Sequence, residues 1–373
     1  MTHKDYLDTS LIISLFDDIG DEELFSICQY NKIESIAAES LRLCFKDKGL
    51  GDNWQVSYDN TKELIASYMS ELDNVSKLLA NNDIDLVALK NSGITRGLYP
   101  FYGSCPMGDI DVLVRKSDFH NAHDILLNNG YTMKFRSPLE EVNIEKAEQG
   151  GGAEYSVVLP NGYNLWFELQ WRPVAGRWIR PDQEPSAEEL IERSTKINSS
   201  DARLLSPEDN LMQVCLHTAK HSYVRAPGFR LHTDVDRIVR CCSIDWALFI
   251  QQVEKLQVKT AVFFSLAFAS DLLKTPVPEA VFSQLKPSFW KVLVISKWLR
   301  KVGIFDPDGK KWGSFGYIIF VSLLYDTLGG LLRSIIPDKK WMKDHYGVKS
   351  SISLPFYYIL RLVNLIWKRT LNK

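Results

Sequence analysis

The stretch that decides the fold of this chain covers residues 90–114 and reads KNSGITRGLYPFYGSCPMGDIDVLV. Its last six residues alternate acidic and apolar side chains and then become fully apolar, which predicts a buried strand. Successive strand residues point to opposite faces of a sheet, so Asp109 and Asp111 share one face. Two carboxylates on one rigid strand repel each other unless a cation lies between them. This pair therefore predicts a metal site.

A third acidic residue lies on a later predicted strand. Residues 154–159 and 163–170 form two strand-like runs, and the Pro-Asn-Gly sequence at 160–162 between them is typical of a hairpin turn. Glu168 stands between two apolar neighbours on the second run, where an acid is costly unless it is paired or binds a metal. We therefore predict that Glu168 completes the site.

The chemistry of three carboxylates favours Mg²⁺, or Mn²⁺ in its place, because these hard ions take oxygen ligands and keep positions open for substrate phosphates. Such a site supports nucleotidyl transfer, in which one ion activates the attacking oxygen and the other stabilises the leaving pyrophosphate. An Asp-x-Asp pair is a short pattern that also occurs on solvated strand ends without a metal. The Gly/Ser turn before it, the apolar strand after it and the later acid together favour the metal site.

The period of the apolar residues changes along the chain. It is helical over 1–80, strand-like and mixed over 81–178, and helical again over 187–335, and a basic, aromatic segment follows at 336–373. Residues 178–186, rich in proline and charge, are the predicted linker. We expect an α+β fold with a small mixed β-sheet of about five strands, flanking helices, and a C-terminal helical domain that closes one side of a cleft.

Local signals place individual elements. Apolar stripes and capping residues predict helices over 61–79, 117–129, 206–221, 245–273 and 289–302. A short buried strand is predicted over 84–89, and Gly130 is expected to end its helix in a left-handed conformation. Residues 315–332 are almost entirely apolar but contain Asp326. Because a central carboxylate is costly in a bilayer, this stretch predicts a buried core helix.

Composition bounds the class of protein. A net charge of −2 with 45% hydrophobic residues favours a globular chain over a disordered one and over a nucleic-acid coat. The six cysteines are scattered without a CxxC pair, which favours reduced thiols. The N-terminus lacks the basic and apolar regions of a secretory signal. We therefore predict a cytoplasmic location, and no motif indicates a nucleic-acid partner.

A set of motifs in a fixed order carries a family resemblance. Its members are Leu89-Lys90, Tyr99-Pro100, GDIDVLV at 108–114, Gly130-Tyr131, ELQWR at 168–172, and His217, His221, Arg230 and Asp234. The set resembles the uncharacterised nucleotidyltransferase family of the DNA polymerase β superfamily, over roughly residues 80–345. The resemblance implies that Asp109, Asp111 and the acid at 168 hold divalent metal. It also implies that the turn at Ser92 and Gly93 binds nucleotide phosphates through backbone N–H groups.

The chain departs from the family pattern at three places. Asn91 replaces the glycine that often follows the lysine. Where the later strand commonly has an aspartate and a histidine, this chain has Glu168 and Gln170. An arginine that is common shortly before the first aspartate is missing within residues 104–106. Lys90 or Arg96 would then bind the triphosphate in its place.

These features predict a metal-dependent nucleotidyltransferase. It would move a nucleotidyl group from a nucleoside triphosphate to an unidentified acceptor, which would be a small molecule, a glycan or a peptide. The process would then be glycan or peptide modification. Lys90, Ser92 and Gly93 would hold the phosphates, and Glu168 would also act as general base. Two alternatives stay open: a degenerate nucleotidyltransferase fold that only binds, and sugar transfer from a nucleotide-sugar, because an Asp-x-Asp site grips any nucleoside diphosphate.

Three other features have more than one interpretation. His217 and His221 share a helix face, which is compatible with zinc, a substrate pocket or structural histidines, but the glutamate of an HExxH motif is missing between them. Asp234 and Asp236 form a second Asp-x-Asp, predicted on a helix, where the two side chains diverge by about 200° and make a poor metal site. From residue 333 onward basic and aromatic residues interleave. They predict contact with an anionic membrane or with a polyanionic acceptor, or else a terminal helix packed on the core.

Overall fold

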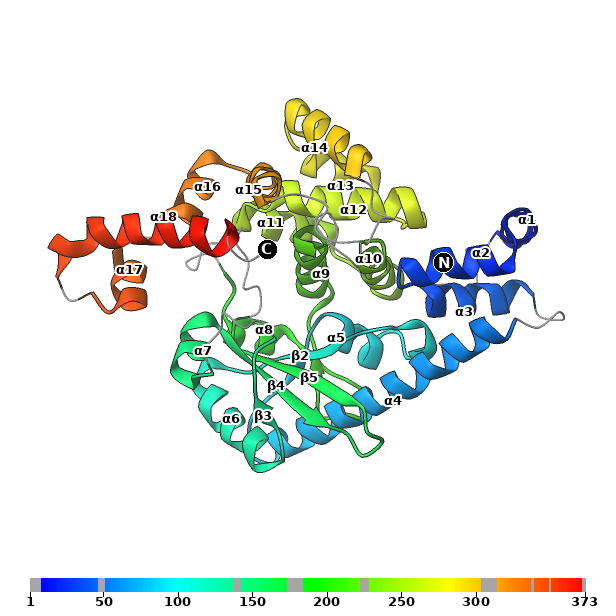
Figure 1. Ribbon diagram of the computed structural model, residues 1–373, viewed down its shortest axis with the longest axis horizontal. Coiled ribbons are helices and arrows are strands. Elements are labelled where there is room, and N and C mark those ends of the chain that lie inside the picture. The colour runs from blue at the N-terminus through cyan, green and yellow to red at the C-terminus, as the bar shows by residue number, and fades with distance from the viewer. Residues whose placement is uncertain are drawn as a thin grey trace.

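The computed structural model describes residues 8–45, 51–136, 142–172, 184–221, 228–302, 314–336, 339–348 and 350–370. In these stretches the fold is α+β, as the sequence predicts. A mixed sheet lies between a layer of helices on one side and a larger helical body on the other (Figure 1). The predicted linker at 178–186 falls mostly on residues outside the described ranges.

The central sheet is mixed. Its strands are β1 (Val87–Ala88), β2 (Asp109–Leu113), β3 (Thr132–Met133), β4 (Gly152–Val158), β5 (Asn164–Gln170), β6 (Thr195–Lys196) and β7 (Arg203–Leu204). They lie in the order β3-β4-β5-β2-β1-β7-β6, with β2–β5 and β1–β7 parallel and the other pairs antiparallel. The described residues thus form seven strands where about five were predicted. The strands β3, β6 and β7 have two residues each, too few for an alternating pattern to be recognised.

The predicted hairpin is confirmed. Strands β4 and β5 pair antiparallel along their whole length. The backbone N–H of Leu159 donates to the carbonyl of Tyr163 at 2.8 Å, and Gly162 in the turn has a φ of +86°. That left-handed conformation is the one that glycine adopts without steric cost.

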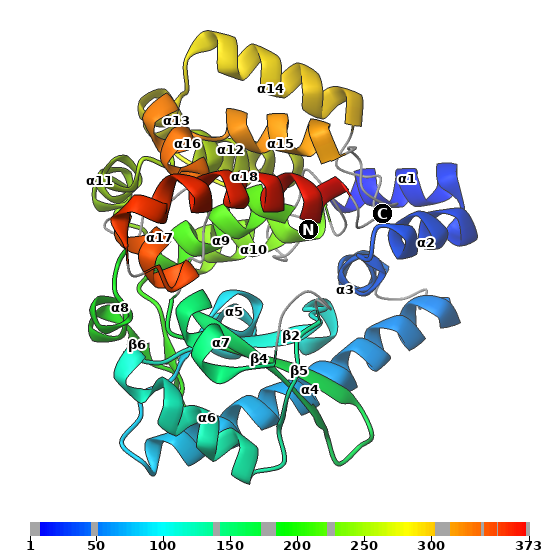
Figure 2. The ribbon, with the colours of Figure 1, turned by 60° about the vertical axis from the view of Figure 1, so that its left-hand side comes forward.

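Alternation along β2 and β5 separates apolar from acidic side chains. Val112 of β2 and Phe167 of β5 are at most 1% exposed and lie in one core with helices α4 (Asp52–Ala80) and α6 (Phe119–Asn128). Both helices cover the same face of the sheet in two views (Figures 1 and 2). The acidic residues of the two strands therefore point to the other face, toward the helical body.

The helical body packs on α5 (Lys90–Gly97), the helix that directly follows β1. Its inner helices are α9 (Pro207–His221) and α10 (Arg230–Cys241). Ile94 of α5 belongs to the same hydrophobic core as residues of both helices. The N-terminal turn of α5 is thereby held between the acidic face of the sheet and the helical body.

The N-terminal helices form a small core of their own. Helices α1 (Thr9–Ile19), α2 (Asp21–Tyr30) and α3 (Glu34–Cys44) pack around Trp54 in the first turns of α4, and this side chain is fully buried. From Ile65 onward the same helix packs on the sheet. The long α4 therefore connects the N-terminal helices to the sheet.

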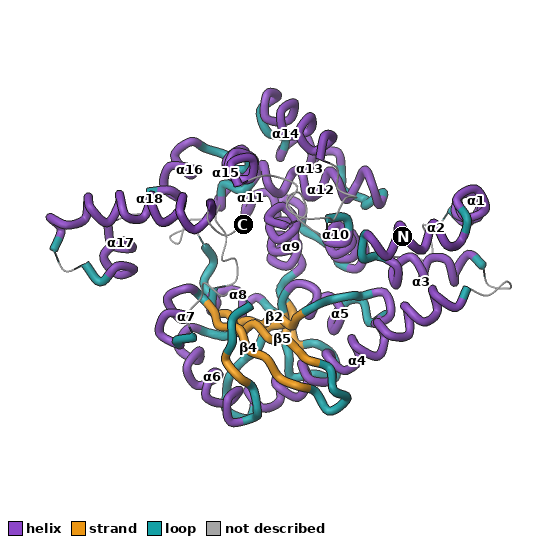
Figure 3. The backbone as a smooth tube through the Cα atoms, viewed as in Figure 1, coloured by secondary structure: helices purple, strands orange, loops and turns teal. Residues whose placement is uncertain are grey.

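The remaining elements are mostly helical, as Figure 3 shows. They are η2 (Tyr102–Ser104), η3 (Lys116–Asp118), α7 (Ile144–Gly150), α8 (Ala187–Arg193), α11 (Trp246–Leu256), α12 (Lys259–Leu273), α13 (Glu279–Leu285), α14 (Phe289–Val302), α15 (Ser314–Leu323), α16 (Leu328–Ile335), α17 (Lys339–Tyr346), η4 (Ser351–Ser353) and α18 (Leu354–Thr370). The predicted helix at 289–302 is confirmed as α14, and that at 206–221 as α9. The predicted helix at 245–273 is two helices, α11 and α12. Gly130 has a φ of +87°, the predicted left-handed conformation.

The apolar stretch 315–332 differs from the prediction of one core helix. It forms α15 and α16, and Asp326 lies between them. The Asp326 carboxylate accepts the backbone N–H groups of Lys259 and Thr260 at 2.6 and 2.7 Å, at the start of α12. The first N–H groups of a helix have no partner within it, so the Asp326 carboxylate caps α12. It makes these contacts from the connection between α15 and α16 and not from within a continuous helix.

Two further findings concern the environment of the chain. All six cysteines are free, as predicted, and Cys28, Cys105 and Cys215 are buried. Within the ranges given above, every helix falls short, in length or in apolar content, of what crossing a lipid bilayer requires.

Candidate metal centre

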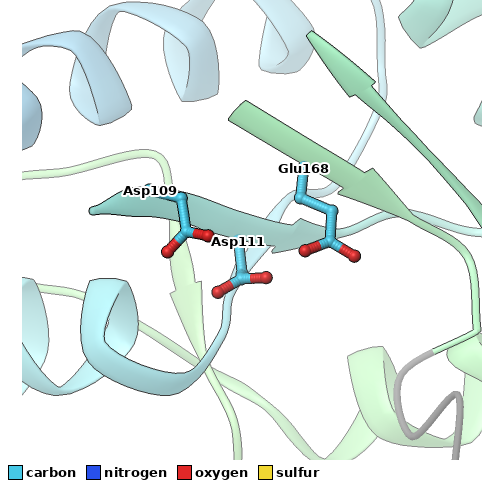
Figure 4. A group of neighbouring side chains, drawn as sticks. All are labelled: Asp109, Asp111 and Glu168. Atoms are coloured by element: carbon cyan, nitrogen blue, oxygen red, sulfur yellow. The ribbon is translucent and has the colours of Figure 1, made fainter. Parts of the chain in front are cut away.

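Three acidic side chains converge on the face of the sheet that looks toward the helical body. Asp109 and Asp111 lie on β2, and Glu168 lies on the parallel neighbour β5, directly opposite Asp111 in the register. One oxygen from each carboxylate lies within 4.8 Å of the others. Figure 4 shows the three side chains projecting to the same side of the two strands. The sequence-based expectation that these three residues come together is met.

Burial raises the pKa of two of these acids. Asp111 is 5% exposed, and burial raises its pKa to about 7, with Lys90 opposing the shift and Glu168 adding to it. The pKa of Asp109 is raised first by burial and then by the negative charge of Asp111. Both shifts have the same physical origin, because a buried carboxylate without enough positive charge around it favours the protonated form.

Lys90 supplies one positive charge. Its Nζ lies 2.7 Å from Asp111 Oδ1. Burial disfavours the ammonium, but Asp111, Glu168 and Asp109 outweigh burial and raise the pKa of Lys90. The lysine has a φ of +49°, and its backbone N–H donates to Gln213 Oε1 of α9 at 3.2 Å. The helical body therefore helps to hold a strained backbone conformation at the site.

Arg136 supplies a second positive charge. It follows the edge strand β3, and its Nη1 lies 2.6 Å from Asp109 Oδ2. Its Nε donates to Glu154 Oε2 at 3.3 Å, and its Nη2 lies 3.9 Å from Glu168 Oε2. Burial disfavours the guanidinium charge, but the neighbouring acids outweigh it and raise the pKa of Arg136.

Gln170 is a further partner of the cluster. Its Nε2 donates to Asp111 Oδ1 at 3.1 Å. From the sequence alone, no role in the site was predicted for Gln170 or Arg136. Gln170 had a usable signal, because it stands two residues after Glu168 on the same strand and so shares its face. Arg136 had none, because it lies in a loop 25 residues after Asp111 and reaches the site only through the fold.

Ser92 and Gly93 hold α5 against the strands. The Ser92 hydroxyl accepts the backbone N–H of Asp111 at 3.1 Å. A Cβ at Gly93 would lie 2.5 Å from the carbonyl oxygen of Ala88, so only glycine permits this approach of helix and strand. These contacts give both residues a structural role beside the acidic cluster. Their predicted role in phosphate binding stays a prediction.

Arg96, the remaining predicted nucleotide ligand, is bound by residues outside the acidic cluster. Its Nε donates to both oxygens of Asp73 on α4, at 3.0 and 3.1 Å. Its other nitrogens donate to the carbonyls of Asn198 and Ser199 at 3.4 and 3.0 Å. In this arrangement the guanidinium ties α5 to α4 and to the turn between β6 and β7.

Residues of the helical body contact the start of α5 beside the acidic cluster. With its amide nitrogen turned toward α10, Asn91 donates to both oxygens of Asp234 at 2.6 and 2.8 Å and accepts from Arg230 at 3.1 Å. Burial lowers the pKa of His217 well below its ordinary value, and the positive charges of Lys90 and other neighbours add to this effect. Asn91, at which the chain departs from the family pattern, thus joins the start of α5 to α10.

The donor set fits a hard divalent cation. The three acids carry up to three negative charges, and Lys90 and Arg136 bring two positive charges, so the cluster keeps an excess negative charge in a largely buried place. Carboxylate oxygens are the ligands that Mg²⁺ and Mn²⁺ prefer. Among the described residues, no other group of three or more histidines, cysteines or acids could hold a metal ion, so the zinc interpretation of His217 and His221 gains no support.

The fold and this cluster define the class of protein: a mixed sheet that presents an Asp-x-Asp pair and a third acid beneath a helical body, as in nucleotidyltransferases. A family model described as uncharacterised nucleotidyltransferase matches residues 17–274, and the chain belongs to this family. No curated protein matches the chain. The resemblance predicted from the motifs is confirmed, but it begins near residue 17 rather than 80 and ends at 274 rather than 345. Most of the N-terminal helices are part of the family fold, and α13 to α18 lie beyond the match. Membership supports assignment as a transferase.

Proposed function

We propose that the protein transfers a nucleotidyl group from a nucleoside triphosphate to an acceptor hydroxyl, with Mg²⁺ or Mn²⁺ held by Asp109, Asp111 and Glu168. The observation that carries the proposal is the convergence of these carboxylates from two parallel strands, with oxygens within 4.8 Å of one another. A rigid sheet keeps such a set in place without reorganisation during the reaction. The family to which the chain belongs supports nucleotidyl transfer as the reaction class.

Divalent ions at this site would neutralise phosphate charge and lower the pKa of the acceptor hydroxyl. The reaction balances without a further reactant. The acceptor oxygen forms a bond to the α-phosphorus, and the bond between that phosphorus and its bridging oxygen breaks. Pyrophosphate leaves with the electron pair. Glu168, opposite Asp111 on β5, takes up the proton of the acceptor as general base.

The cations of the chain have a second use in this reaction. Lys90 and Arg136 now neutralise Asp111 and Asp109. With divalent ions bound to these acids, Lys90 and Arg136 would be available for phosphate oxygens, to which lysine and arginine form charge-assisted hydrogen bonds. Arg136 would thereby replace the arginine that the chain lacks within residues 104–106.

The test is a titration of the full chain with each nucleoside triphosphate and with nucleotide-sugars, in Mg²⁺ and in EDTA. Binding to the folded state raises the melting temperature, and pyrophosphate release reports turnover. We expect a Mg²⁺-dependent shift for at least one triphosphate, and its loss in Asp109→Ala. The matched control is Asp124→Ala, which removes an exposed acid from α6 on the opposite face of the sheet.

Each outcome decides between the functions. Pyrophosphate release that depends on Asp109 supports transfer. A Mg²⁺-dependent shift without release supports the degenerate binding protein instead. A shift with a nucleotide-sugar and none with a triphosphate supports sugar transfer. If the wild-type protein responds to no nucleotide and behaves as Asp109→Ala does, the proposal is contradicted.

A further inference from the structure

Helix α18 exposes a row of large apolar side chains. Phe356, Ile359 and Val363 are 64%, 62% and 49% exposed, and Ile352 in the preceding η4 is 91% exposed. Spacings of three and four residues place the three α18 side chains on one side of the helix. Leu354, two residues before Phe356 and therefore on the other side, is 4% exposed. Helix α18 thus packs one side on the protein and leaves an apolar side open.

Helix α16 has the same character. Leu328 at its start, Leu332 in its middle and Ile336 just after its end are 72%, 50% and 50% exposed and follow one another at spacings of four. Arg333 beside them is also exposed. Scattered apolar residues are ordinary on a protein surface, but rows of them along two helices mark an interaction surface. Helices α16 to α18 lie at the outside of the helical body (Figures 1 and 2).

The charge of this part of the chain selects the partner. Residues 328–373 contain nine lysines and arginines and two aspartates, a net charge of +7, whereas the whole chain carries −2, so that residues 1–327 carry −9. The basic residues are Arg333, Lys339, Lys340, Lys343, Lys349, Arg361, Lys368, Arg369 and Lys373. A strongly basic segment that exposes rows of apolar side chains complements a partner that is apolar within and anionic outside.

We infer that α16 to α18 bind the surface of an anionic lipid bilayer, with their exposed apolar side chains in the interface and the exposed Arg333 and Lys339 among the headgroups. The helices lie on the membrane and do not cross it, since none of the described helices is suited to spanning. A second copy of the chain is a poorer partner, because it would bring +7 against +7. The inference goes beyond nucleotidyl transfer and does not rest on it.

The test is co-sedimentation of the full chain with vesicles of phosphatidylcholine alone and of phosphatidylcholine with phosphatidylglycerol. We expect binding to the anionic vesicles, at least about tenfold weaker binding to neutral ones, and a decrease as salt rises from 0.1 to 0.5 M, on the order expected for several basic residues. Phe356→Ser with Ile359→Ser should weaken binding about tenfold through lost apolar burial. Arg333→Gln with Lys339→Gln should weaken it roughly fivefold per charge.

A matched variant separates this surface from general stickiness. Val56→Ser with Val158→Ser removes two apolar side chains that are 56% and 69% exposed on α4 and β4, and should leave vesicle binding unchanged. Circular dichroism melting of all variants checks that they fold, and the nucleotide-dependent thermal shift should be the same in each. That second measurement keeps a failure of this inference distinct from a failure of the proposed function.

Three results would overturn the inference. The wild-type chain fails to bind anionic vesicles at low salt, or the Phe356/Ile359 variant binds them as well as wild type does. Alternatively, sedimentation shows a dimer that this variant abolishes, which would assign the surface to self-association. An acidic protein partner would give the first of these results.

Discussion

Two of the Asp-x-Asp pairs in this chain share a spacing but lie on different kinds of secondary structure. Asp109 and Asp111 lie on β2, where residues two apart share a face, so their carboxylates converge with a third acid. Asp234 and Asp236 lie on α10, where residues two apart are about 200° apart around the axis. The secondary structure therefore decides whether two acids make one site or two separate contacts.

Two arginines neutralise the two acids of the helical pair. Asp234 Oδ1 lies 3.6 Å from Arg237 Nη1, three residues on, and Asp236 Oδ1 lies 2.8 Å from Arg240 Nε, four residues on. Thr275 also donates to Asp236 Oδ1 at 2.7 Å. Helical neighbours at three and four residues meet on the surface of the helix, so each acid has a cation of its own. The strand pair forms one cluster with Glu168, in which two cations, Lys90 and Arg136, face three acids, and this deficit favours a metal ion there.

Removing a charge from the strand pair, Asp109 and Asp111, should impair function and leave folding intact. Asp111→Asn keeps the shape of the side chain and removes its charge, and we expect at least about a thousandfold loss of metal-dependent pyrophosphate release, because metal ions contribute several kcal/mol of charge stabilisation. The folded-state pKa of Asp111 is raised to about 7 by burial, above its unfolded value. Its contribution to stability is therefore present at low pH and lost as the pH rises through about 7.

Thermal melting checks this sign. In the absence of metal, Asp111→Asn should melt at the same temperature as wild type at pH 4 and at an equal or higher temperature at pH 8. A variant that unfolds at pH 8 while wild type stays folded would mean that Asp111 serves the fold, like the acids of α10.

Removing an acid from the helical pair, Asp234 and Asp236, should destabilise the folded state. Asp236 is fully buried, and Asp236→Ala leaves Arg240 without this partner, so we expect a loss of about 3 to 5 kcal/mol in the free energy of unfolding. Urea denaturation measures it, with Asp124→Ala on the surface of α6 as the control that should change little. The folded fraction should still bind Mn²⁺ with the affinity of wild type. Wild-type stability together with lost metal binding would reverse the comparison.

Metal binding at the strand pair should depend on pH. Ligand carboxylates bind metal in the ionised form, and burial raises the pKa of Asp111 to about 7. Below that pH a proton must leave before metal binds, so the affinity for Mn²⁺ should fall about tenfold per pH unit and level off above pH 8. Isothermal titration at pH 6, 7 and 8 measures this. Equal affinities at pH 6 and 8 would show that Asp111 is not a ligand.

Arg136 sharpens the comparison further, because it is the cation that the strand pair receives from a distant loop. Arg136→Gln removes a charge that competes with metal for Asp109, and we expect Mn²⁺ to bind roughly threefold to tenfold more tightly in the absence of nucleotide, a modest effect for a partly exposed ion pair. Turnover of the triphosphate should fall in the same variant. The control is Arg115→Gln, which breaks a pair with Asp85 outside the cluster. Unchanged metal affinity in Arg136→Gln would remove the competing role.

The local pattern predicted most of the acidic site, and its limits are instructive. The alternation on β2 and β5 was sufficient to place Asp109, Asp111 and Glu168 on one face, because side-chain direction in a strand depends only on residue parity. The parallel pairing of β2 with β5, which brings Glu168 opposite Asp111, was decided by the fold. The short strands and the break at Asp326 were missed, since two-residue strands and caps made by distant carboxylates leave no periodic signal.

The sequence by itself determined the class of this protein through its resemblance to a family in an ordered set of motifs. It also determined that Asp109 and Asp111 share a face of their strand and that Asp234 and Asp236 diverge on a helix, because side-chain direction within one element follows from local geometry. Only the tertiary structure decided which cations neutralise the cluster. It brought Arg136 across the sheet to Asp109, and it bound Arg96 to Asp73 rather than to the site. It also brought Gly93 so close to the backbone of Ala88 that only glycine fits there. These contacts join residues that are far apart along the chain, and the packing of whole elements, which no local pattern contains, determines their distances.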